Sequence, residues 1–209
     1  MALHDPRAFA DDMHQLMASG GTDASVQQGR SVEPDELLRG WREDRLRFVD
    51  VAASLDPSQR VPWYGPAMAA RSFITARLME TWAHGQDVAD ALGVDRRPSA
   101  RLRHVAHLGV RARPFSYTIN GLPLPEADIA VRLTGPDGEA WEWGPSDTGP
   151  VNLVSGSALD FCLAVTQRRN LADTSLTIAG AAAAEWMTIA QAFGGGPGTG
   201  RRPGQFKDR

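Results

Sequence analysis

The spacing of apolar residues predicts a chain that is helical in its first half and mixed in its second. Before Arg113, apolar side chains recur mainly every three or four residues, which is typical of amphipathic helices. The period then shortens to two, most clearly over Asp128–Thr134, which is typical of half-buried strands. Helical patterns return between and after the strands. Helices followed by a segregated group of strands and helices indicate an α+β fold class.

Helix boundaries in the first half follow from proline and glycine. Asp5-Pro6 and Glu33-Pro34 are typical helix starts, and the second of these predicts a helix to about Leu55. The longest predicted helix covers Ile74–Gly93, and another follows Ser99. The expected core side of the second helix consists of Leu37, Leu38, Trp41, Phe48, Val49 and Ala52.

The second half predicts short strands joined by turns. Pro136-Asp137-Gly138 indicates a hairpin turn, and Ser155 or Ser157 is expected to cap a helix. The strands are expected at 115–119, 128–134, 140–143, 151–154 and 175–179, with a final helix at 181–193. Together the patterns predict a helical domain at 1–113, an α+β domain at 114–193 and a disordered glycine-rich tail at 194–209.

The helix predicted at 74–93 carries the clearest candidate chemistry. Glu80 and His84 are four residues apart, so they share one helical face, which Arg77 and Asp87 extend. The apolar stripe is expected on the other side, at Ile74, Leu78, Thr81, Trp82, Val88 and Leu92. A carboxylate and an imidazole suit zinc, and to a lesser degree nickel, iron or manganese.

This spacing has two interpretations. Glu80 and His84 are two of the three protein ligands of a catalytic zinc, with Asp87 as a third ligand or as the partner that orients the imidazole. The alternative is an ordinary ion pair on a helix surface, which the spacing alone favours.

Composition narrows the class of protein. The net charge is −3, so no basic field favours a nucleic-acid partner. No apolar run reaches the roughly 20 residues of a membrane span, and no signal peptide is recognisable. The single cysteine, Cys162, lies in an apolar run and is expected to be a buried, inert thiol. We therefore expect a cytoplasmic protein without a membrane partner.

Further candidates lie outside the central helix. Trp63 and Tyr64 occupy a proline-rich loop, where they either line a pocket or anchor the loop. His104 and His107 are three residues apart but lack an acidic neighbour, so a structural role is expected.

Several motifs together resemble the mycothiol-dependent maleylpyruvate isomerase family, and most closely an actinobacterial branch of metal-binding proteins. The similar segments are VPWYGPAM, RLMETWAHGQDVADALG, RLRHVAHLGVR, LDFCLAVTQRR and AAEWMTIAQAF. The resemblance implies a DinB-like metal-binding bundle followed by a sterol-carrier-like domain. It also implies that Glu80 and His84 are metal ligands and that Asp87 is the acid that follows them. The family's further histidine lies on an earlier helix, ahead of the first residues of this chain.

The resemblance implies a divalent metal, with zinc favoured, and mycothiol as thiol cosubstrate. The metal would lower the pKa of the thiol, so that an isomerase or transferase acts on a small electrophilic substrate. Arg77, Arg168 and Arg169 are candidates for binding substrate carboxylates, and a surface salt bridge is the alternative for each. The competing hypothesis is a non-catalytic protein that binds a small ligand, with Trp63, Trp141 and Trp143 lining its pocket. An apolar groove left by an absent first helix would favour a homodimer.

Overall fold

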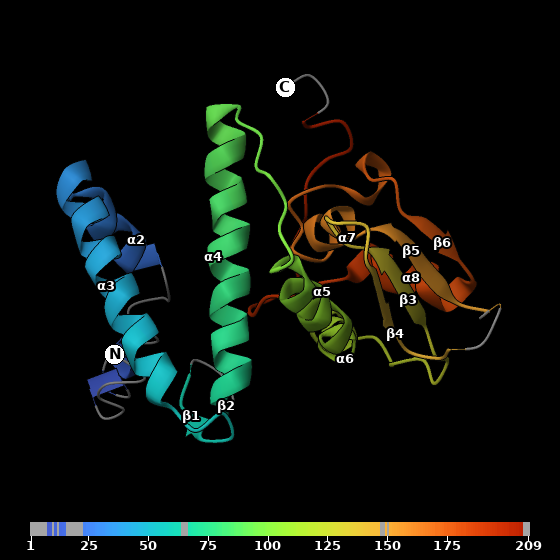
Figure 1. Ribbon diagram of the computed structural model, residues 1–209, viewed down its shortest axis with the longest axis horizontal. Helices are drawn as coiled ribbons and strands as arrows, with labels where there is room; N and C mark the ends of the chain where they lie inside the picture. The colour runs from blue at the N-terminus through green and yellow to red at the C-terminus, as the bar shows by residue number, and fades with distance from the viewer. Residues whose placement is uncertain are drawn as a thin grey trace. The chain divides into compact units, whose positions relative to one another are not determined.

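The computed structural model of this 209-residue chain describes residues 8–9, 11, 13–15, 23–63, 67–146, 149 and 151–206. The chain divides into two compact units, Met1–Ile74 and Thr75–Arg209. Helices dominate the described part of the first unit, and the second contains a four-stranded sheet, so the predicted α+β class is confirmed (Figure 1). The predicted domain boundary at residue 113 stays a prediction.

The first unit contains helix α2 (Asp23–Arg30), helix α3 (Pro34–Ser54) and a small hairpin of β1 (Arg60–Val61) and β2 (Met68–Ala69). The hairpin leads into the first turn of helix α4 (Ala70–Leu92). A small apolar core forms where the hairpin meets the helices. It consists of Val61, Ala70 and Phe73, with Phe48, Leu55, Trp63 and Met68 packed against it.

Most of the α3 residues that were predicted to face the core are not buried. None of its side chains is fully buried, and Leu37, Trp41 and Val49 are about half exposed, at 52%, 49% and 56%. Only the C-terminal part of α3 contributes to the small core, through Phe48. The apolar spacing therefore identified the helix correctly but did not identify what covers it.

Helix α4 confirms the predicted central helix, which ends before Gly93 in the left-handed region at φ 64°. Its buried stripe differs from the predicted one: Val88 and Leu92 are 60% and 70% exposed. The buried residues of α4 in the second unit are Met79, Ala83, Gln86 and Ala89. Alanine side chains are short, so other segments of the second unit can pack closely against this side of α4. This side is therefore buried, although its side chains are less apolar than those of the predicted stripe.

The sheet of the second unit has the order β4-β3-β5-β6. Its strands are β3 (Ala130–Thr134), β4 (Ala140–Trp143), β5 (Leu153–Ser157) and β6 (Thr177–Ala179). β3 runs antiparallel to β4 and parallel to β5, and Val131 lies opposite both Trp143 and Val154. Residues directly opposite share a face, so these apolar side chains line one face of the sheet.

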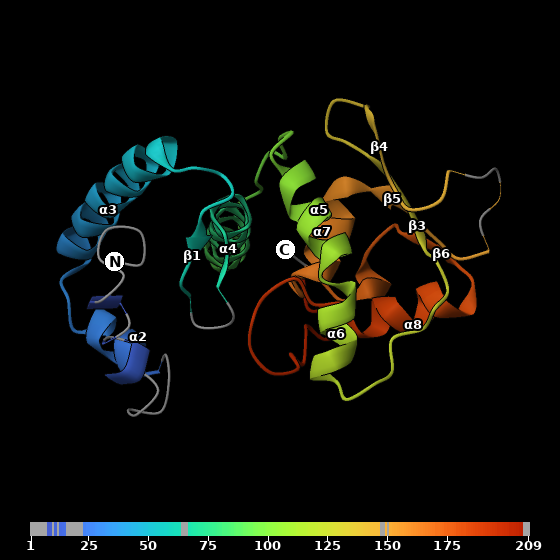
Figure 2. The same cartoon turned by 90° about the horizontal axis from the view of Figure 1, so that it is seen from below.

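Helices cover this apolar face (Figure 2). Helix α7 (Ala158–Val165) packs on β3 and β5, and α8 (Ala181–Ile189) packs on β6. Helices α5 (Leu102–Arg111) and α6 (Arg113–Ile119) lie against α7 and α8, respectively. A short 3₁₀ turn, η1, covers Leu171–Asp173. The shared core contains the aromatic side chains of Tyr117, Phe161 and Trp186, all almost fully buried.

Two local predictions in this unit have clear outcomes. Ser157 caps α7, since its hydroxyl accepts hydrogen bonds from the backbone N–H groups of Leu159 and Asp160. The strand predicted at 115–119 is wrong, because these residues belong to α6. Pro114 lies in the first turn of that helix, where its missing N–H costs nothing, so it begins a helix rather than only ending one.

The segment after Phe193, expected to be disordered, makes specific contacts in the structure as far as Phe206. The buried Gln191 amide donates to the Gly196 carbonyl and accepts from the Gly198 N–H. Asn170 donates to the Arg201 carbonyl, and Asp173 accepts from the Gly204 N–H. Polar side chains of the second unit thus form hydrogen bonds with backbone N–H and carbonyl groups of a segment that has no regular secondary structure. No described helix is both long and apolar enough to span a bilayer.

Candidate functional site

The Glu80–His84 pair lies on the part of α4 that belongs to the second unit. The imidazole Nε2 of His84 is 3.4 Å from Oε2 of Glu80. The Glu80 side chain is mostly buried, whereas that of His84 is 68% exposed. One helical turn therefore presents an oxygen and a nitrogen ligand together at a solvent-accessible place.

Asp87 lies on the other side of the imidazole, with Oδ2 at 3.2 Å from His84 Nδ1. Arg168 donates to the same oxygen, and Arg201 donates to Oδ1, each over 2.8 Å. Burial raises the pKa of Asp87, but the hydrogen bond and charge of Arg168, the His84 contact and the charge of Arg201 outweigh it, so the net shift is downward. The carboxylate is thus held ionised between two guanidinium groups and the imidazole.

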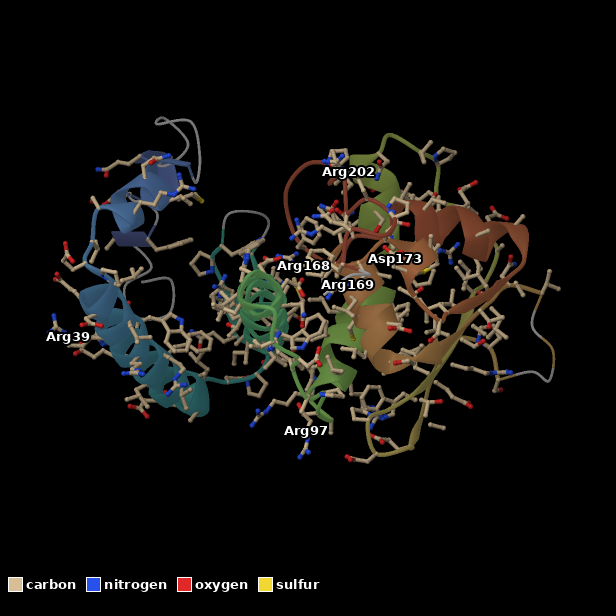
Figure 3. All side chains as sticks on the ribbon, turned by 90° about the horizontal axis from the view of Figure 1, so that it is seen from above. Arg39, Arg97, Arg168, Arg169, Asp173 and Arg202 are labelled. Atoms are coloured by element: carbon tan, nitrogen blue, oxygen red, sulfur yellow. The ribbon has the colours of Figure 1, made fainter. Side chains whose placement is uncertain are left out.

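A second ion pair lies one turn further along α4. Arg169 donates to both oxygens of Asp90, each over 2.8 Å, and Gln86 donates to Oδ1 over 2.9 Å. The Arg169 guanidinium also lies over the Phe206 ring, 4.2 Å from its centroid. Arg168 and Arg169 both come from the loop after α7 and are directed to the same helix (Figure 3).

The donor set suits a metal ion in part. Two ligands at the usual zinc distances of about 2.0–2.1 Å and at a tetrahedral angle lie roughly 3.3 Å from each other. The 3.4 Å between His84 Nε2 and Glu80 Oε2 agrees with this separation. In the described part of the chain, however, no cluster of three or more His, Cys, Asp or Glu side chains could hold a metal ion. Glu80 and His84 therefore fit as two ligands of a site that needs another.

The other predicted site residues are distributed differently. Arg168 lies within 3.4 Å of His84, while Arg169 contacts Asp90 instead. Arg77 is exposed on α4, one turn before Glu80. Trp63 belongs to the first unit, where it packs against the small core, and Tyr64 lies outside the described residues.

Sequence reasoning missed Arg201 and Asp90. The glycine- and proline-rich surroundings of Arg201 predict disorder, so nothing in the sequence pointed to a contact with α4. Asp90 follows Asp87 by three residues and Gln86 by four, which was a usable signal for the same helical face.

The remaining candidates have structural contacts. The indole of Trp143 donates to His107 Nδ1 over 3.1 Å, which ties β4 to α5. Trp141 is 3% exposed and belongs to the core. Cys162 is fully buried, and burial raises its pKa, so the prediction that this thiol is buried is confirmed.

Comparison with known proteins shows what the chain is similar to. Residues 1–89, which include Glu80, His84 and Asp87, match the mycothiol maleylpyruvate isomerase N-terminal domain. The uncharacterized protein MT0041 of Mycobacterium tuberculosis strain CDC 1551 / Oshkosh is 46% identical over 202 residues, 96% of this chain and 78% of its own length. The uncharacterized protein Rv0036c of strain ATCC 25618 / H37Rv gives the same values. No solved structure matches the chain.

This degree of identity over nearly the whole chain defines a shared family. The chain belongs to one family with these two mycobacterial proteins, and its residues 1–89 match the mycothiol maleylpyruvate isomerase N-terminal domain. The DinB-like and sterol-carrier-like assignments of the two parts stay predictions.

Proposed function

We propose that this protein binds a divalent metal, with zinc favoured, and acts as a mycothiol-dependent isomerase or transferase on a small electrophilic substrate. The observation that carries the proposal is the 3.4 Å separation of His84 Nε2 and Glu80 Oε2. It is long for a hydrogen bond between nitrogen and oxygen, which is normally 2.7–3.2 Å, but suits two ligands of one ion. The match of residues 1–89 to the mycothiol maleylpyruvate isomerase N-terminal domain supports the thiol and the reaction class.

Each residue of the site has a defined role in this proposal. Glu80 and His84 hold the ion, and Asp87 accepts the Nδ1–H of His84, which leaves Nε2 free to bind. A bound divalent ion lowers the pKa of a thiol that coordinates it. Arg168 is the candidate arginine nearest to His84, and a substrate carboxylate that binds it would compete with its ion pair to Asp87. Arg77 stays a weaker candidate for the same role.

The bidentate pair of Arg169 with Asp90 favours the salt-bridge interpretation of that arginine. Trp63 and Tyr64 stay proposals as residues that contact the thiol or substrate. A non-catalytic protein with a vestigial metal site is the second candidate. It is favoured by one observation: the described residues near Glu80 and His84 supply two ligands, whereas a catalytic zinc usually has three.

Metal content tests the proposal. The protein is loaded with zinc, desalted and analysed for zinc per chain, together with Glu80→Ala and His84→Ala. Glu126→Ala and His104→Ala are the matched controls, because both residues are exposed and lie on other segments. We expect near-stoichiometric zinc in the parent and both controls, and loss in both site variants.

A folded parent without zinc, or zinc retained by both site variants, contradicts the metal site. Where zinc is bound, conversion of maleylpyruvate is then measured with and without mycothiol. Zinc binding without any thiol-dependent conversion of this substrate would favour the non-catalytic alternative.

A further inference from the structure

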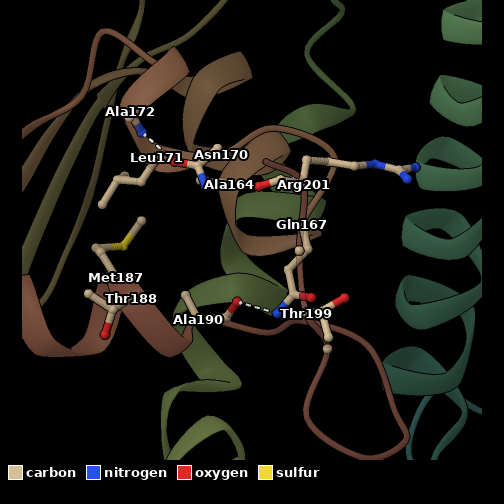
Figure 4. Close-up of a pocket in the computed structure, with 12 residues that line it drawn as sticks. Ala164, Gln167, Asn170, Leu171, Ala172, Met187, Thr188, Ala190, Thr199 and Arg201 are labelled. Carbon is tan, nitrogen blue, oxygen red and sulfur yellow. Dashed lines mark hydrogen bonds between the residues drawn. The ribbon is translucent and has the colours of Figure 1, made fainter. Parts of the chain in front are cut away.

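A separate cavity of about 500 Å³ opens to solvent on the second unit, formed by four segments. The C-terminal end of α7 and the residues after it contribute one wall, and η1 and α8 contribute two more (Figure 4). Gly198 to Arg201 form the fourth. The volume falls within the range of about 300–1,000 Å³ that is typical of small-molecule sites.

Apolar groups provide the larger part of the cavity's lining, and polar groups provide the rest. Leu171 from η1 and Met187 from α8 point toward one another across it in Figure 4. Ala164, Ala172 and Ala190 contribute small apolar surfaces. Leucine and the flexible thioether of methionine adapt to apolar ligands of irregular shape.

The lining has polar groups that could form hydrogen bonds with a ligand, but its charged side chain is already paired. Within the described residues, the Oε1 atom of Gln167 and the hydroxyl of Thr199 have no hydrogen-bond partner. Among the described residues that line the cavity, Arg201 is the charged one, and its side chain runs away from the cavity to Asp87, at 2.8 Å (Figure 4). A charged ligand would therefore lose hydration without gaining an ionic partner.

Gln167 occupies a backbone position that favours glycine. Its φ is 59°, and it ends α7 in a Schellman motif, with its own N–H bonded to the Ala164 carbonyl and that of Arg168 bonded to Leu163. The left-handed conformation is unfavourable for a residue that has a side chain. In return, the motif directs a carboxamide into the lining of the cavity, beside Thr199.

The fourth wall is fixed in place from several sides. Gln191 binds the backbone of Gly196 and Gly198, and Asn170 binds that of Arg201. A wall held by such contacts keeps the cavity open before a ligand arrives, which lowers the entropic cost of binding.

We propose that this cavity binds a neutral small molecule with an apolar body and a single amine, amide or hydroxyl group. The apolar body lies between Leu171 and Met187, and the polar group bonds to Gln167 or Thr199. The site is distinct from the Glu80–His84 pair and does not depend on a metal.

N-Phenyl-1-naphthylamine is a suitable probe, because it is neutral, has an apolar body with one N–H donor, and fluoresces more strongly in apolar surroundings. The titration uses metal-free full-length protein labelled with [methyl-¹³C]methionine. We expect saturable binding and a shift of the Met187 methyl signal, assigned with Met187→Leu. The Met79 signal, from a buried residue of α4 away from the lining, should stay in place.

Two variants test the lining. Gln167→Gly keeps the backbone conformation and removes the amide, so probe affinity should fall about five- to tenfold. Thr199→Trp should block the cavity, whereas Thr177→Trp on the exposed edge of β6 should bind like the parent. No saturable binding, binding without a Met187 shift, or unchanged affinity in both lining variants would overturn the proposal.

Discussion

Arg201 donates to Asp87 across 114 positions of sequence, with Nη2 at 2.8 Å from Oδ1. The contact joins an irregular C-terminal segment to the helix that carries the candidate metal ligands. Asp87 also contacts His84, so a single side chain, that of Asp87, links the C-terminal segment to the imidazole. The side chains around Asp87 thus come from α4, from the loop after α7 and from the C-terminal segment.

Removal of this contact should weaken the second unit. Both side chains are about one-third exposed, so we expect Arg201→Ala to lower the free energy of unfolding by about 1 kcal/mol. A double-mutant cycle with Asp87→Ala, measured by urea unfolding, should give a coupling of about 0.5–1 kcal/mol. Arg202→Ala is the control, because its side chain is exposed, and its effect should stay within about 0.5 kcal/mol. A coupling near zero would show that the pair adds no stability.

The Asp90–Arg169 pair should have a larger effect. It is bidentate, and its side chains are 9% and 20% exposed, so solvent screens it less. We expect Asp90→Asn to cost about 2–3 kcal/mol, since it leaves the guanidinium without its counterion. Equal losses for Asp90→Asn and Arg201→Ala in the same unfolding experiment would contradict this ranking.

The Asp90–Arg169 pair should also make the free energy of unfolding depend on pH in the acidic range. Burial raises the pKa of Asp90, but hydrogen bonds from Arg169 and Gln86 outweigh it and lower the pKa below 3.8. A lowered carboxyl pKa adds stability that is complete above the unfolded value and is lost as the pH falls through the folded value. The parent should therefore lose stability below about pH 4 more steeply than Asp90→Asn. Parallel profiles in urea titrations between pH 2.5 and 5 would show that another group governs this range.

Local patterns predicted the parts of the fold that local interactions determine. The Ser157 hydroxyl caps α7 within three residues of sequence, and the hairpin turn at Pro136 joins neighbouring strands. The i, i+4 spacing of Glu80 and His84 likewise placed both side chains on one face before any tertiary contact was known.

Tertiary contacts decided the rest. The alternation at 115–119 is compatible with a strand, but packing of α6 on α8 gives a helix. The segment of Arg201 is held by Asn170 and Asp173, which bond to the backbone of Arg201 and Gly204 from 31 positions earlier in the sequence. The sequence therefore placed Glu80 and His84 on one helical face and named Arg168 as a candidate, but it did not indicate that Arg201 lies beside Asp87.

His107 should produce a pH dependence near neutrality. Burial lowers its pKa below 6.5, assisted by the charges of Arg111, His104 and Arg103, and the neutral ring accepts the Trp143 indole N–H. A lowered histidine pKa means that the unfolded chain binds the proton more readily, so stability is complete above pH 6.5 and falls as the pH drops. His107→Gln keeps an acceptor for the indole and should flatten the profile between pH 5 and 7. His104→Gln retains His107 and should keep most of the slope. An unchanged slope in His107→Gln would contradict the assignment.

The two glycines that flank β4 should differ sharply in their tolerance of alanine. Gly138 and Gly144 have nearly equal left-handed φ values, 86° and 84°. A Cβ at Gly138 would meet open space, whereas one at Gly144 would overlap the backbone carbonyl oxygen of Ile129, which cannot rotate away as a side chain could. We expect Gly138→Ala to cost about 1 kcal/mol, from the left-handed conformation alone. Gly144→Ala should cost at least about 3 kcal/mol, because β3 must shift as well. Urea unfolding measures both changes, and similar losses would mean that conformation rather than this close approach dominates at Gly144.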